Sequence, residues 1–149
     1  MLKRGLTMVA RIAEAADRGA DGLRGASASE RPCGRAPELD LDFLARQTFG
    51  DRDLEAELLR LFDMQAAKAL DRLAAPFASG EEAPLADFAH AIKGSARAIG
   101  AVATAAAAGE YEEALRAGAS DVEAARDRLA SALTAVRIAL ARRLDLRGG

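Results

Sequence analysis

One short segment of the chain carries residue types that could do chemistry. It contains His90, the single histidine of the protein, followed by Lys93 three positions later and Gly94 four positions later. On a helix these three positions share one face. A solvent-facing imidazole is a titratable nucleophile, a nearby cation attracts anionic groups, and a glycine leaves space for an approaching molecule. The arrangement indicates nucleophilic chemistry at His90 rather than packing.

The segment around His90 has the period of an amphipathic helix. At about 100° per residue, the apolar side chains on the side opposite His90 are Leu85, Phe88, Ile92, Ala96 and Ile99. We therefore expect His90 to face solvent. The residues expected to share its face are Ala86, Lys93, Gly94 and Arg97. The alternative is a surface histidine without a role, which the types of its neighbours disfavour.

The order His-x-x-Lys-Gly-Ser, followed by an apolar residue and Gly-Ala, resembles the histidine-containing phosphotransfer (HPt) domains of bacterial phosphorelays. The residues that carry the resemblance are His90, Lys93, Gly94, Ser95, Ile99, Gly100 and Ala101. Upstream, the leucines of segment 58–73 look like the family's preceding core helix. Downstream, Tyr111-Glu112 stands where the family has an apolar residue followed by Glu or Gln. The resemblance extends over residues 38–144.

The resemblance implies a role for each matching polar residue. His90 would be the phosphorylated nucleophile, holding the phosphoryl group in a labile P–N bond that an aspartate accepts. Lys93 would offset charge that develops during transfer, and Gly94 would let a receiver domain come close. Glu112 would accept a hydrogen bond from the second imidazole nitrogen and so fix the tautomer. The alternatives are a solvated lysine, a close helix contact at the glycine and a solvent-facing glutamate.

Two further residues of the motif have supporting roles. Ser95 is expected to be structural first, with its hydroxyl bonded to the carbonyl four residues earlier. Arg97 would contribute to a cationic docking surface, with a merely solvated arginine as the alternative. Glu110 and Glu113 are expected to be solvated.

The composition excludes several other classes of protein. The 149 residues include 21 basic and 23 acidic residues, a formal net charge of −2, whereas a general nucleic-acid-binding protein carries a basic surplus. Cys33 is the single cysteine, and one cysteine with one histidine does not make a zinc site. No segment approaches the ~20 apolar residues of a membrane span.

The pattern of elements predicts an all-α protein, an antiparallel four-helix bundle with a short extra N-terminal helix. The expected helices span residues 40–49, 53–75, a segment around His90 that has Pro84 in its first turn and ends near 99, then 102–117 and 121–144. Ser79 and Glu82 have the spacing of a capping box before the His90 helix, and Pro84 suits its first turn.

The N-terminal part of the sequence differs in composition from the rest. Residues 17–37 are rich in Gly, Ala, Ser, Arg and Pro, and segment 1–12 lacks the continuous apolar run of a secretory signal. We expect a disordered tail over residues 1–36 and the HPt domain over residues 37–146.

These features lead to a free-standing phosphoryl carrier in the cytoplasm. We expect it to accept phosphate from one receiver aspartate and to pass it to another, with response-regulator receiver domains and a hybrid sensor histidine kinase as partners. The sequence shows no glycine-rich ATP-binding pattern, so we expect a carrier rather than a kinase. We also expect a monomer without a cofactor, any Mg²⁺ belonging to the receiver. The alternatives are a helical adaptor that never carries phosphate and a phosphotransferase whose bundle forms from two chains.

Overall fold

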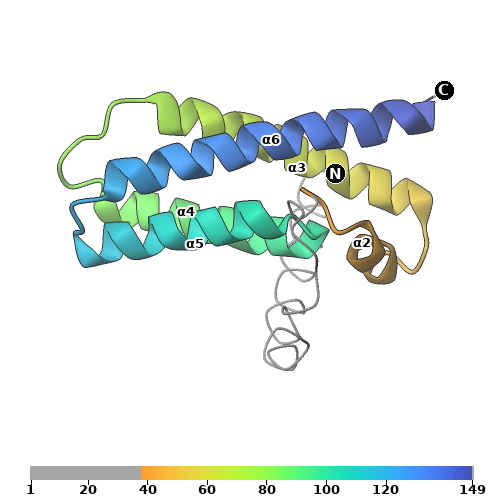
Figure 1. Ribbon diagram of the computed structural model, residues 1–149, viewed down its shortest axis with the longest axis horizontal. Helices are drawn as coiled ribbons and strands as arrows, with labels where there is room; N and C mark the ends of the chain where they lie inside the picture. The colour runs from red at the N-terminus through yellow and green to blue at the C-terminus, as the bar shows by residue number, and fades with distance from the viewer. Residues whose placement is uncertain (1–37, 149) are drawn as a thin grey trace, which may run out of the picture.

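The computed structural model describes residues 38–148 of the chain, and these residues form five helices without a strand. In chain order they are α2 (Leu41–Gln47), α3 (Arg52–Ala74), α4 (Glu82–Ile99), α5 (Val102–Ala117) and α6 (Val122–Gly148) (Figure 1). The predicted all-α class is confirmed, and the predicted helices differ from these by a few residues at their ends. The expected tail over residues 1–36 lies outside the described residues.

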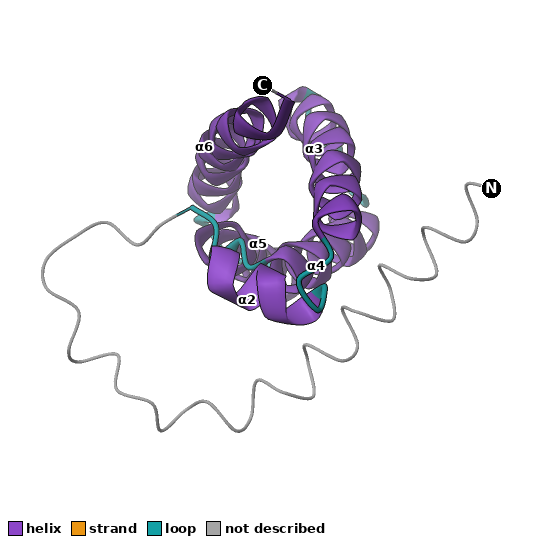
Figure 2. Ribbon diagram, turned by 90° about the vertical axis from the view of Figure 1, so that its right-hand side faces the viewer, coloured by secondary structure: helices purple, strands orange, loops and turns teal. Residues whose placement is uncertain are grey.

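Four long helices form a bundle, and the short α2 crosses one of its ends (Figures 1 and 2). α4 packs along α5, α6 packs against α5 and α3, and α3 closes the ring against α4. Because the connections are short, consecutive long helices run antiparallel. Within residues 38–148, no helix has the length and apolar character needed to cross a membrane.

The core consists of one apolar face from each long helix. Its fully buried large side chains include Leu59 on α3, Ile92 on α4, Tyr111 on α5 and Leu129 on α6. Burial of one such side chain stabilises a fold by about 1.5–3 kcal/mol. Many of the buried residues of α4 and α5 are alanines, which allow the backbones of these two helices to approach closely.

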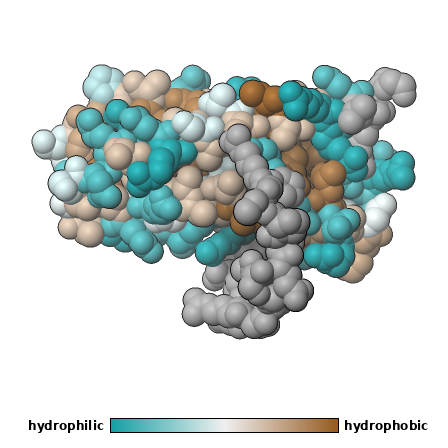
Figure 3. All heavy atoms as spheres, in the orientation of Figure 1, coloured by the Kyte–Doolittle hydropathy of each residue, from teal (hydrophilic) through white to brown (hydrophobic). Residues whose placement is uncertain are grey.

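Several large apolar side chains of the described residues are exposed. Figure 3 shows hydrophilic and apolar residues interspersed over one face of the molecule. Among the exposed large apolar residues, Phe49 lies in the turn between α2 and α3, and Ile138 lies on α6. Scattered residues of this kind are ordinary on soluble proteins.

One detail of the predicted α4 face is wrong. Ala86 is buried rather than exposed beside His90. Phe88 lies on the predicted apolar side, where it is half-buried and packs against the core. Ala86 is buried because α4 lies between α3 and α5. Its buried arc therefore includes Ala86 and Ala89 in addition to the stripe through Ile92. Two neighbouring helices thus bury more of the circumference of α4 than the apolar stripe in its sequence predicts, and the exposed part is correspondingly narrower.

The start of α4 also differs from the sequence prediction. The helix begins after Glu81, and no side chain caps its first turn, so the predicted capping box of Ser79 and Glu82 is wrong. The Glu81 carboxylate instead accepts from the backbone N–H of Ala78 at 3.3 Å and from Arg72 at 3.5 Å. These bonds tie the loop to the end of α3. Pro84 lies in the first turn of α4, as predicted.

A tight junction joins α4 to α5 and also anchors α2. Gly100 has a φ of 79°, and the N–H of Ala101 donates to the carbonyl of Ala96 at 2.8 Å, which ends α4 in a Schellman motif. The N–H of Asp40 donates to the carbonyl of Gly100 at 2.9 Å, while the Asp40 side chain caps α2 by accepting from Phe43. A Cβ at Gly100 would lie 2.8 Å from the Asp40 carbonyl oxygen. Only glycine fits this position.

Replacing Gly100 with alanine is expected to lower the free energy of unfolding by about 2–4 kcal/mol. The left-handed backbone conformation accounts for about 1–2 kcal/mol. The rest comes from the contact between the new Cβ and the Asp40 carbonyl oxygen, because the backbone at Asp40 must shift to relieve it. Urea denaturation measures the loss. Gly118→Ala is the matched control, since Gly118 also ends a helix with a positive φ of 61° but has open space around it. Equal losses in the two variants would contradict the role assigned to the contact.

Candidate functional site

The site is built on the exposed arc of α4 where that arc meets α5. His90 lies in the middle of α4, and 64% of its side chain is exposed. Its ring nevertheless has a fixed partner, because Nδ1 lies 3.1 Å from Oε1 of Glu112 on α5. An ionised carboxylate is purely an acceptor, so Nδ1 is the nitrogen that carries the hydrogen. In the neutral ring, Nε2 then keeps its lone pair.

Glu112 is the least exposed polar group of the site. Its side chain is only 10% exposed, so it is not the solvent-facing glutamate of the alternative interpretation. Oε2 accepts a hydrogen bond of 2.7 Å from Nζ of Lys93, which is itself 20% exposed. Lys93 is therefore held against α5, one turn after His90, rather than extended into solvent.

A glycine on α5 lies beside the aliphatic part of this lysine. A Cβ at Gly109 would lie 3.5 Å from Cδ of Lys93, which is ordinary contact distance. The aliphatic part of the lysine thus crosses α5 at a position without a side chain and reaches Glu112 one turn further on. The motif around His90 does not point to Gly109, although a glycine within a helix is itself a signal of a close contact.

Arg116 and Asp87 extend the network, and the sequence analysis did not find them. Arg116 donates from Nε to Oε1 of Glu112 at 3.3 Å and from a terminal nitrogen to Asp87 at 3.3 Å. Arg116 stands one turn after Glu112 on α5, a spacing that predicts contact. Asp87 stands one turn before His90 on α4. The side chains of Asp87, Arg116 and Glu112 therefore form a series of ion pairs with alternating charges beside the imidazole.

The pKa of Glu112 reflects this surrounding charge. Burial alone would raise the pKa of its carboxyl group. The hydrogen bond and charge of Lys93, the hydrogen bond of Arg116 and the charge of His90 outweigh burial, so the pKa lies below its ordinary value. Glu112 is consequently ionised at neutral pH, as an acceptor of three donors must be.

The other predicted residues lie around this network. Gly94 is half-buried and Arg97 is exposed on the next turns of α4. Ser95 is half-buried, and the hydrogen bond expected for its hydroxyl stays a prediction. Glu110 is paired with Arg128 of α6 at 3.0 Å on the surface. Among residues 38–148, no group of three or more acidic, histidine or cysteine side chains could hold a metal ion.

Two comparisons with known proteins find similar chains. The sequence model of the Hpt domain family matches residues 57–141. The fold is similar to the crystal structure of histidine-containing phosphotransfer protein B (HptB) from Pseudomonas aeruginosa PAO1, with a TM-score of 0.66 and 28% sequence identity. That match covers 74% of this chain and 97% of the HptB chain. No curated protein sequence matches the chain significantly.

The chain belongs to the Hpt domain family. Family membership and the similarity to HptB make phosphotransfer its general role. The roles of the individual site residues stay predictions, since neither comparison assigns them.

Replacing Glu112 with glutamine is expected to destabilise the protein by about 1–2 kcal/mol at neutral pH, because charge-assisted hydrogen bonds are lost. The folded-state pKa of Glu112 is depressed. Its ionised form therefore stabilises the fold fully above the ordinary glutamate pKa of about 4.3, and this contribution disappears as pH falls through the lower folded value. Urea denaturation between about pH 7 and pH 3 measures the difference between wild type and variant. We expect it to be constant above about pH 5 and to shrink below about pH 4.

The control for this measurement is Glu113→Gln, the exposed neighbour of Glu112 on α5. Its effect is expected to stay within about 0.5 kcal/mol at every pH, as for most surface substitutions. A Glu112→Gln deficit that does not change with pH would show that the loss arises from packing and not from charge.

Proposed function

We propose that the protein is a phosphorelay intermediate in which His90 accepts a phosphoryl group from the aspartate of one receiver domain and passes it to the aspartate of another. The observation that carries the proposal is an exposed imidazole whose Nδ1 is fixed by a largely buried, ionised carboxylate. This arrangement leaves the second ring nitrogen facing a partner. Membership of the Hpt family supports it independently.

The chemistry follows from the tautomer. The lone pair of Nε2 attacks the phosphorus of the receiver's aspartyl phosphate, a P–N bond forms, and the P–O bond to the aspartate breaks as that carboxylate leaves. The ring becomes a cation that keeps its hydrogen on Nδ1. The negative charge of Glu112, 3.1 Å away, stabilises this cation. Transfer to a second receiver is the same step in reverse.

Lys93 and Gly94 would act where the receiver and its phosphoryl group meet this chain. Lys93 holds a positive charge one turn from His90, where it attracts the phosphoryl oxygens as charge spreads over them in a loose transition state. Gly94 keeps the same face free of a side chain, and Arg97 adds a cation to the docking surface. Mg²⁺ in this scheme is bound by the receiver, not by this chain.

The pathway context belongs to the same proposal. The partners are response-regulator receiver domains and a hybrid sensor histidine kinase, and the protein acts in the cytoplasm as a monomeric carrier without kinase activity. One described bundle supplies all four long helices, which supports a monomer. Size-exclusion chromatography of the full chain tests the monomer directly, and a stable dimer would favour a site shared by two chains.

His90→Gln is expected to abolish phosphate uptake from a phosphorylated receiver. Glutamine has no ring nitrogen to form the P–N bond, and the exposed position lets the fold tolerate it. The measurement is incubation with a labelled phosphoreceiver followed by assay for acid-labile, base-stable phosphate on this chain, with helix content checked by circular dichroism. If the wild type takes up no phosphate, or if the variant still does, the proposal that the protein carries phosphate on His90 is wrong and the adaptor alternative is favoured.

Gly94→Gln is expected to impair receiver binding, and Lys93→Ala is expected to impair phosphoryl transfer. The glutamine side chain would project beside His90 and weaken receiver binding, while the helix tolerates the change because glycine is the poorer helix former. Lys93→Ala keeps the surface open, so binding persists while single-turnover transfer slows by about tenfold or more. Receiver affinity and single-turnover transfer are measured for both variants.

The matched control is Ala124→Gln, which adds the same side chain at an exposed position of α6. It should bind and transfer like wild type. If Gly94→Gln and Lys93→Ala also behave like wild type, the receiver uses a different face of the bundle.

A further inference from the structure

The turn between α2 and α3 holds a phenylalanine in a backbone conformation that large side chains rarely adopt. Phe49 has a φ of 53°, and it is the one non-glycine residue of the segment 38–148 with a positive φ. This left-handed conformation is unfavourable for residues with a Cβ and is a clear outlier for a bulky side chain, whereas glycine and asparagine adopt it more readily. The backbone of the turn therefore gives no reason for a phenylalanine at this position.

The ring of Phe49 makes no contribution to the core. Its residue is 97% exposed, the highest value among the exposed large apolar residues that the structure describes. Other groups hold the turn, since the N–H of Gly50 donates to the carbonyl of Ala45 at 2.9 Å. The N–H of Asp51 donates to the carbonyl of Thr48, also at 2.9 Å. A hydrogen-bonded turn thus displays a strained, uncovered aromatic ring, and strained residues of this kind are concentrated at functional sites.

α2 and the turn after it lie beside the layer of the bundle that carries the phosphotransfer site. Figures 1 and 2 show α2 across the end of the α4–α5 pair, on the level of that pair. The hydrogen bond from Asp40 to the carbonyl of Gly100 fixes α2 there. The path from His90 along α4 to Gly100, and from Asp40 along α2 to Phe49, is about 30 Å at 1.5 Å per residue. A standard interface buries about 800 Å² on each partner, a patch about 30 Å across, so one partner can contact both His90 and Phe49.

Large apolar side chains are scarce on the surface next to His90. None on α4 is exposed, and the exposed one on α5 is Val102, the first residue of that helix. Exposed apolar side chains gather instead at the α2 end, where Leu41 and Val102 flank the hydrogen bond that joins α2 to the α4–α5 junction. A few well-packed side chains, often aromatic, carry most of the affinity of a protein interface. A partner that docks on His90 therefore gains its apolar contacts by extending toward α2.

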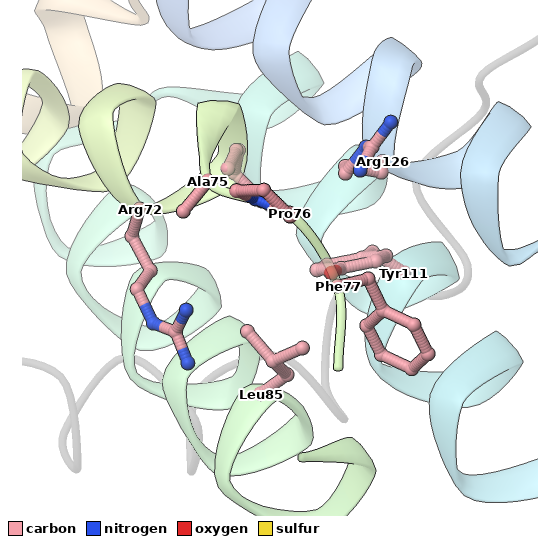
Figure 4. A pocket seen from close by; sticks show the side chains of 8 residues that line it. Arg72, Ala75, Pro76, Phe77, Leu85, Tyr111 and Arg126 are labelled. Atoms are coloured by element: carbon pink, nitrogen blue, oxygen red, sulfur yellow. The ribbon is translucent and has the colours of Figure 1, made fainter. Parts of the chain in front are cut away.

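The other exposed aromatic side chain of the described residues differs from Phe49. Phe77 is 42% exposed, and it lines a small hollow together with Leu85 and Tyr111 (Figure 4). Part of its ring is therefore covered by its own chain, and its φ is not positive. Packing within the bundle accounts for Phe77, whereas it does not account for Phe49.

We propose that Phe49 is an anchor for the receiver domain that exchanges phosphate with His90, an inference that rests on the proposed function. The docking surface then runs from His90 past Arg97 and Val102 to the α2–α3 turn. The ring of Phe49 enters an apolar recess at the edge of the receiver's interface. Because the turn already fixes the backbone of Phe49, little conformational entropy is lost on binding. Phe49 determines which receivers bind tightly and does not touch the reacting atoms.

Phe49→Asn in the full chain tests the anchor, with a receiver domain that takes phosphate from or gives phosphate to the wild type as the probe. We expect the dissociation constant for this receiver to rise about tenfold, as for the loss of a buried aromatic anchor. The single-turnover transfer rate at saturating receiver should change by less than about twofold, because only binding is affected. The melting temperature should not fall, since asparagine tolerates the left-handed backbone better. Calorimetric titration, rapid-quench kinetics and circular dichroism measure the three quantities.

The matched control is Phe77→Asn, the same change at the opposite end of the bundle, which should bind the receiver like wild type. Unchanged affinity of Phe49→Asn, or a lower transfer rate at saturation, would overturn the inference. A loss of affinity confined to Phe77→Asn would place the receiver over the other end and overturn it equally. Self-association of the wild type that Phe49→Asn abolishes would make a second copy of the chain the occupant instead.

The same experiment separates this inference from the proposed function. If no receiver exchanges phosphate with the wild type, the proposed function is wrong and the anchor is wrong with it. If a receiver exchanges phosphate with His90 and binds Phe49→Asn as tightly as the wild type, the proposed function stands and the anchor alone is refuted.

Discussion

The ionised carboxylate of Glu112 is the interaction on which the functional part of the structure depends. Its side chain is only 10% exposed and meets a nitrogen of the His90 imidazole, the ammonium group of Lys93 and the guanidinium of Arg116. A carboxylate so placed without donors would carry a large desolvation cost, whereas with three donors it stays ionised. One buried charge thus orients the imidazole, holds the lysine beside it and ties α4 to α5.

The position of this carboxylate depends in turn on the junction between α4 and α5. Ala101 follows the left-handed Gly100 and directly precedes α5, so the two helices form a tight antiparallel pair. His90 lies as many residues before Ala101 as Glu112 lies after it, and the same is true of Lys93 and Gly109. Residues equidistant from the turn face each other across the pair. The alanine-rich interface keeps the helices close enough for these side chains to meet.

α5 has two differently used faces. One stripe carries Glu112 and Arg116 toward His90, and the adjacent stripe carries Tyr111 and Leu115 into the core. Adjacent helix positions are about 100° apart, so a change in the rotation of α5 would affect both. The helix is anchored at its two ends by left-handed glycines, Gly100 before it and Gly118 after it.

The apolar period, the glycine breaks and the spacing of the motif are local properties, so the sequence alone predicts the helices and the order of the reactive residues. It also predicts an exposed face for His90, and the family resemblance adds Glu112 as its partner. The tertiary structure decided what depends on neighbours across the bundle. Ala86 is buried because α4 lies between α3 and α5, the Glu81 side chain pairs with Arg72 at the end of α3, and Arg116, which binds Glu112 on its own helix, also pairs with Asp87 of α4. Contacts between residues distant in sequence follow from how the helices pack, which no single segment encodes.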